Sequence, residues 1–112
     1  MPVVKLAPAL DPKLVEQLKA EHGDTLKLLK AAGETVVVRP PRKVEYERFR
    51  DASFDEKKRA RALEQLVREA VVHPSRDEFD ALLQRKPALS EVFGARVIEL
   101  AGAAVEAEVE DL

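Results

Sequence analysis

Cysteine and tryptophan are absent from this chain of 112 residues, and aromatic residues are few, with four Phe and one Tyr. The absence of cysteine excludes disulfides, thiolate nucleophiles and thiolate-bound metals. Leu, Val and Ala are left to fill a core, which is typical of helix-rich domains and argues against a large all-β fold. Because the chain also lacks a long apolar run and a signal-like N-terminus, we expect a soluble intracellular protein with no membrane partner.

Neither sign of charge is in excess, since 19 Lys and Arg side chains face 21 Asp and Glu and give a formal net charge of −2. A global positive charge that would attract nucleic acid is therefore lacking. Locally, residues 39–61 carry nine basic and five acidic side chains, whereas residues 99–112 carry five acidic and no basic ones. We expect these two segments to attract each other, within one chain or between neighbouring chains.

Side chains able to carry out catalysis are sparse. Ser53 and Ser75 fit helix N-caps, and Ser90 fits a local hydrogen bond to the backbone near a helix start. His22 and His73 each stand beside a residue that ends a helix, where they can interact with free carbonyl groups. We therefore predict that the protein is not an enzyme.

No cofactor or metal is predicted either. The spacings HxxxH and HExxH do not occur, and the four glycines are too scattered for a loop that binds phosphate. Acidic pairs such as Glu45 with Glu47 are interpreted as solvated helix faces, because the chain is highly charged throughout.

The first third of the chain predicts an extended arm, a helix and a hairpin. Residues 1–10 contain two prolines and are expected to be the arm. A helix is predicted from the cap residue Asp11 to His22, where Gly23 follows. Residues 24–38 predict a β-hairpin with its turn at residues 32–34, although residues 24–32 alone also fit a helical spacing.

From Arg42 onward the pattern is helical. Capping boxes are predicted at Ser53 with Glu56 and at Ser75 with Glu78, and a last helix runs from about Pro87 through at least Gly102. We therefore predict an α+β fold in one domain over residues 11–104, in which an N-terminal helix and a small β-hairpin precede a bundle of about four short helices. Residues 105–112 form an acidic tail or continue the last helix.

The last helix carries two apolar stripes when it is drawn at 100° per residue. The first comprises Leu89, Val92, Phe93, Val97, Leu100 and Ala104, and the second comprises Ile98, Gly102, Val105, Val109 and Leu112. Two alternatives remain open: both stripes are buried within one small domain, or one of them contacts another copy or a client protein.

Five short motifs give the chain a resemblance to the tail assembly chaperones of tailed bacteriophages and prophages. They are VVVRPP at residues 36–41, EYERF at 45–49, VVHP at 71–74, EFDALL at 78–83 and PAL at 87–89. The resemblance covers about residues 24–103. In that family a β-hairpin precedes several short helices, and a Ser or Thr stands where this chain has Pro41 and Arg42.

The resemblance implies a non-enzymatic protein that binds the tape-measure protein, keeps it soluble and helps to recruit tail-tube subunits. It would act in the host cytoplasm and be missing from the mature virion. Homo-oligomers are compatible with this role. The residues that we assign to partner binding are Ile98, Val105, Val109 and Leu112, since a chaperone needs exposed apolar side chains on a charged surface.

Two other functions are compatible with the sequence. The alternative is a small helical nucleic-acid-binding or regulatory module that uses residues 39–61. We do not favour a nucleic-acid partner, because no aromatic residues interleave with the run of basic residues at 57–61. The third is a structural subunit of the phage particle.

Overall fold

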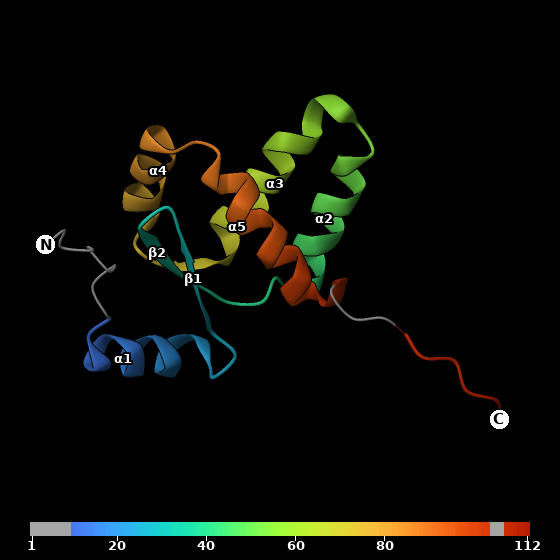
Figure 1. Cartoon of the computed structure of the whole chain (residues 1–112), viewed down its shortest axis with the longest axis horizontal. Helices are drawn as coiled ribbons and strands as arrows, with labels where there is room; N and C mark the ends of the chain where they lie inside the picture. The colour runs from blue at the N-terminus through green and yellow to red at the C-terminus, as the bar shows by residue number, and fades with distance from the viewer. Residues whose placement is uncertain (1–9, 104–106) are drawn as a thin grey trace, which may run out of the picture.

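The computed structural model describes residues 10–103 and 107–112 (Figure 1). Its elements are α1 (Pro12–His22), β1 (Lys27–Ala31), β2 (Glu34–Val38), α2 (Lys43–Ser53), α3 (Glu56–Ala70), β3 (Val71–His73), α4 (Arg76–Arg85), α5 (Leu89–Ile98) and the π-helical turn η1 (Glu99–Ala103). The predicted α+β class, with an N-terminal helix and a hairpin before four further α-helices, is confirmed. Of the predicted arm, only Leu10 lies within the described residues.

Local signals fix the N-terminal elements as predicted. The carboxylate of Asp11 accepts a hydrogen bond from the backbone N–H of Lys13 at 2.9 Å, and Gly23 ends α1 with a φ of 91°. The hairpin turns through Ala32 and Gly33, whose φ values are 52° and 76°. Positive φ at both turn residues matches the right-handed twist of the flanking strands.

A third strand, β3, replaces the last part of the helix that we expected to end at His73. It pairs antiparallel with β2, with His73 opposite Val37 and Val71 opposite Val38. The expectation that His73 interacts with a helix end is therefore wrong. Val71 and Val72 are β-branched and favour a strand. The backbone of β2 supplies their hydrogen-bonding partner, and the helical spacing of this one segment does not reveal that partner.

The capping box predicted at Ser53 is also wrong. Ser53 is the last residue of α2 and donates its hydroxyl hydrogen bond to the carbonyl of Arg50 at 2.7 Å. Asp55 caps α3 instead, by accepting from the backbone N–H of Lys57. The N-cap predicted at Ser75 is confirmed, because its hydroxyl accepts from the N–H of Glu78. The return bond of a capping box is not formed, since the carboxylate of Glu78 accepts from the hydroxyl of Ser75 and not from its backbone N–H.

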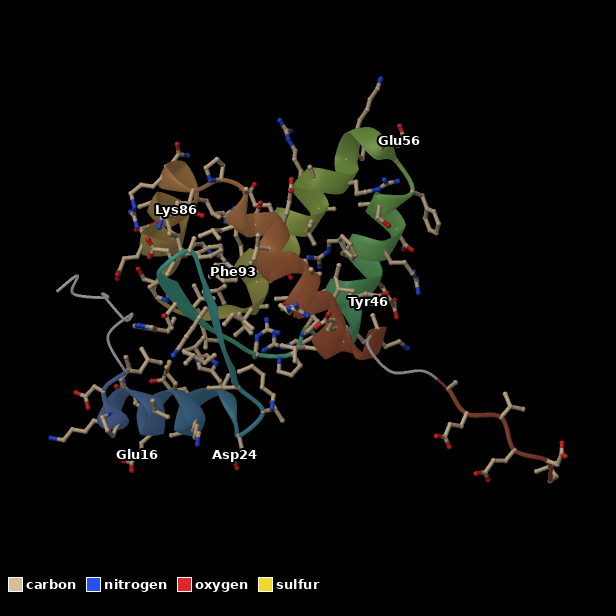
Figure 2. The ribbon with its side chains drawn as sticks, viewed as in Figure 1. Glu16, Asp24, Tyr46, Glu56, Lys86 and Phe93 are labelled. Carbon is tan, nitrogen blue, oxygen red and sulfur yellow. The ribbon has the colours of Figure 1, made fainter. Side chains whose placement is uncertain are left out.

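The three-stranded sheet, in the order β1-β2-β3, separates the main core from α1. Figure 1 shows α1 lying apart from the other helices, and Figure 2 shows Phe93 of α5 deep among the side chains between that helix and the sheet. The buried core residues come from β2, α3, α4 and α5: Val36, Val38, Leu66, Val67, Ala70, Phe79, Leu82, Leu83, Leu89, Phe93 and Val97. Side chains alternate along a strand, so Val37 points to the opposite face, toward α1.

The last α-helix is shorter than predicted. It ends at Ile98, and Gly102, with a φ of 107°, interrupts the π-helical turn that follows. A left-handed residue of this kind terminates a helix. Residues 107–112 are not helical, so the described part of the tail does not continue the last helix.

Gly94 brings α5 close to α3. A methyl group at this position would lie 2.6 Å from Cδ1 and 2.7 Å from Cγ of Leu63. These distances are shorter than any van der Waals contact, so either Leu63 or the helix must move to accept a larger residue. Gly94 therefore permits the close packing of α5 against α3.

We predict that Gly94→Ala destabilises the protein in spite of the higher helix propensity of Ala. The propensity gain is about 1 kcal/mol, whereas overpacking costs about 1–3 kcal/mol. In denaturant unfolding, Gly94→Ala should lower the free energy of unfolding relative to the native sequence. In the background of Leu63→Ala, the same change should raise the free energy of unfolding relative to Leu63→Ala alone. Stabilisation by Gly94→Ala alone would contradict the role of Leu63.

Candidate functional site

The three serines do not form a catalytic group. Ser53 and Ser75 serve the helix ends described above, and the hydroxyl of Ser90 donates to the carbonyl of Pro87 at 3.1 Å, as predicted. In the described ranges, no group of three or more His, Asp or Glu side chains could hold a metal ion. None of the helices in the same ranges has both the length and the apolar character needed to cross a membrane.

Among the described residues, the carboxylate of Glu45 has the largest shift in pKa, and its residue is only 8% exposed. Two nitrogens of Arg39, Nη1 and Nη2, donate to its two oxygens at 2.7 Å each. The backbone N–H of Arg42 donates to the same carboxylate at 2.8 Å, and Nη2 of Arg39 also donates to the carbonyl of Glu69. The interpretation of Glu45 as part of a solvated helix face is therefore wrong.

This network lowers the pKa of Glu45 to about 2. The hydrogen bond from Arg39 is the main cause, and it outweighs the opposing effect of burial; the N–H of Arg42 contributes further. Both carboxylate oxygens accept hydrogen bonds from the protein itself. A carboxylate held ionised in this way is a weak base, so the geometry indicates a structural junction rather than an acid–base catalyst.

Of the four residues predicted to bind a partner, the structure describes three, and these three differ in exposure. Ile98 is partly buried and packs against the core, and Val105 lies outside the described residues. Val109 and Leu112 are fully exposed in the tail. Ile98 therefore fits the alternative in which the second stripe is buried within the domain, and its assignment to partner binding stays a prediction.

Internal ion pairs engage several of the basic side chains in residues 39–61. Arg39 is held by Glu45, Arg48 by Glu69 at 3.0 Å, and Arg50 by Asp51 at 3.2 Å. These pairs reduce the positive charge that the segment offers to phosphates.

An apolar groove of about 360 Å³ lies between α1 and the outer face of the sheet. Leu18 and Val37 are its most buried residues, and Leu28, opposite Val37 in the sheet, is 46% exposed. Its remaining apolar lining is Leu10, Val15 and Leu26, and its charged lining is Lys19, Lys27 and Lys30. Nothing in the sequence pattern alone pointed to this groove, because it forms only when α1 packs across the hairpin.

A second groove of about 370 Å³ lies between α2 and α3. Its apolar lining is Phe49, Ala52, Ala62 and Leu66, and its polar lining is Glu45, Arg48, Lys58, Arg61, Gln65 and Glu69. Phe54, in the turn between the two helices, is 82% exposed.

The comparisons with known proteins place the fold in a family. Residues 18–110 match the model described as "Domain of unknown function (DUF6848)", so the chain belongs to that family. It is similar in fold to a solved structure, the uncharacterised protein rbstp2171 from Bacillus stearothermophilus, with a TM-score of 0.70 and 18% sequence identity. That similarity covers 86% of this chain and 99% of the other. No curated protein matches the chain.

Acid should destabilise the protein through Glu45. The folded state lowers the pKa of this group to about 2, below its ordinary value of 4.5, so its contribution is complete above about pH 5 and is lost as the pH falls toward 2. Between pH 5 and pH 2 we expect the free energy of unfolding of the native sequence to fall by roughly 2–3 kcal/mol more than that of Glu45→Gln. Denaturant unfolding at several pH values measures the difference, and parallel curves for the two proteins would contradict the assignment.

Breaking one side of the Arg39–Glu45 pair should be worse than replacing both. Glu45→Met leaves a buried guanidinium without its partner, which costs about 3–5 kcal/mol. The double change Arg39→Met with Glu45→Met removes both charges, and we expect it to be at least 1 kcal/mol more stable than Glu45→Met alone. Additive losses in urea unfolding of the two singles and the double would refute a coupled pair.

Proposed function

We propose that the chain is a non-enzymatic tail assembly chaperone of a tailed bacteriophage or prophage. In this role it binds the tape-measure protein in the cytoplasm of the bacterial host, keeps it soluble, assists assembly of the tail tube and leaves before the virion matures. The observation that carries the proposal is the apolar groove between α1 and the sheet.

The shape of this groove suits a helical client. Its apolar residues come from one helix and from the outer face of a hairpin, which together form a trough into which an amphipathic helix can place its apolar side chains. Leu28 of this lining is half exposed, while Leu18 and Val37 are buried. Burying a Leu side chain of this kind contributes about 1.5–3 kcal/mol, so a few such contacts suffice for a reversible complex.

The charge around the groove adds selectivity. Three lysines, Lys19, Lys27 and Lys30, belong to its lining, and each is exposed. They favour a client helix whose polar face carries Asp or Glu, and they raise the rate of encounter more than the affinity. Because the apolar contacts dominate, the complex should survive moderate salt.

The resemblance in the motifs also supports the proposal. VVVRPP contains the end of β2 and Arg39, and EYERF contains Glu45, Arg48 and Phe49. These residues build the junction between the sheet and the helices, so the shared motifs maintain the scaffold on which the groove rests. They contain no catalytic group.

Leu28→Asp tests the proposal, with Val92→Asp as its matched control. Leu28 is 46% exposed and lines the groove, whereas Val92 is 48% exposed on α5 and lines neither groove. We expect co-expression with the tape-measure protein of the same phage to give a soluble complex for the native sequence and for Val92→Asp. Leu28→Asp should reduce the recovered complex at least tenfold, since a buried charge replaces an apolar contact.

A pull-down across a salt series distinguishes the alternatives, with circular dichroism confirming that each variant is folded. No complex with the native sequence, or equal recovery with Leu28→Asp, would refute the groove as the client site. Retention of nucleic acid that disappears at moderate salt would instead favour the basic residues of the 39–61 segment.

A further inference from the structure

The groove between α2 and α3 is lined by two carboxylates, Glu45 and Glu69, each paired with an arginine, and by two further cations beside an apolar floor. Arg48 is paired with Glu69, but within the described part of the chain no carboxylate lies within 4 Å of the charged groups of Lys58 or Arg61. Both side chains line the groove next to Phe49 and Leu66. A ligand that fits must therefore supply apolar side chains and carboxylates together.

Residues 107–112 have that composition. The segment AEVEDL contains three carboxylates, on Glu108, Glu110 and Asp111, and two large apolar side chains, on Val109 and Leu112. Val109 is 95% exposed and Leu112 is completely exposed. Figure 1 shows this segment running away from the helices, so its apolar side chains have no partner within its own domain.

Helical spacing explains how the segment can fit the groove. Val109 and Leu112 are three residues apart and share one face of a helix, and Glu108 and Asp111 both lie on the same side of that face. Placed on the apolar floor, the segment would direct these two carboxylates toward the cations beside it. The same contacts are available to an extended peptide only in part, because neighbouring side chains then alternate between two faces.

We propose that residues 107–112 of one copy bind the α2–α3 groove of a second copy. Reciprocal exchange fills both grooves and closes a two-fold symmetric dimer. The contact is small and partly electrostatic, so the dimer is weak, depends on concentration and weakens with salt. It does not use the groove between α1 and the sheet, so it is independent of the client site proposed above.

Charge reversal in two different full-length chains provides the test. One variant carries Lys58→Glu and Arg61→Glu in the groove, and the other carries Glu108→Lys and Asp111→Lys in the tail. Each alone should show at least a tenfold weaker self-association than the native sequence in sedimentation equilibrium and light scattering. Mixed in equal amounts they should form a dimer, because each tail then meets a groove of opposite charge.

The control Lys13→Glu with Lys57→Glu makes the same charge change at two exposed residues outside the groove and should dimerise like the native sequence. Val109→Ser with Leu112→Ser should weaken the dimer at least tenfold without touching the folded domain. Leu28→Asp should leave the dimer unchanged, which separates this test from that of client binding.

Three results would overturn the proposal. The native protein remains monomeric up to millimolar concentration in low salt, the mixed variants fail to associate, or the Val109 and Leu112 substitutions have no effect. A monomer whose compactness nevertheless depends on the tail charges would indicate that the tail folds back on its own groove instead.

Discussion

The ion pair between Arg39 and Glu45 is the interaction on which the arrangement of the elements depends. Arg39 follows β2, Glu45 lies in the first turn of α2, and the carbonyl of Glu69 near the end of α3 accepts from the same guanidinium. The backbone N–H of Arg39 also donates to the carbonyl of Ala70, directly before β3. One side chain thus ties the sheet to the α2–α3 hairpin, and with it fixes the groove between those helices.

The same pair explains how α2 begins without the usual cap. Arg42 precedes the helix and its side chain makes no capping hydrogen bond, yet its N–H is satisfied by the carboxylate of Glu45. Ser or Thr, expected at this place from the family resemblance, would satisfy a different backbone N–H. Here the buried carboxylate of Glu45 satisfies a backbone N–H at the start of the helix. The two hydrogen bonds from Arg39 offset the free-energy cost of burying this carboxylate.

Elements set by neighbours in sequence could be predicted, and those set by distant partners could not. Asp11, Gly23, the turn at Ala32 and the cap at Ser75 each act within four residues, and all four followed from the sequence. Strand β3 exists because β2 lies beside it, and Glu45 is buried because α3 covers it. Neither contact can be predicted from the hydrophobic periodicity of a single segment. The α1–sheet groove was missed for the same reason, since its residues belong to separate elements.

The two grooves divide the surface into independent sites. Figure 1 places α1 below the sheet and the α2–α3 hairpin on the far side of α5, so neither groove shares a residue with the other. A protein that both holds an apolar client and associates with itself needs such separation, because a single apolar surface would make the two contacts compete. In the proposed dimer the carboxylates of the acidic tail face Lys58 and Arg61 beside α3, which leaves the groove between α1 and the sheet to the proposed client helix.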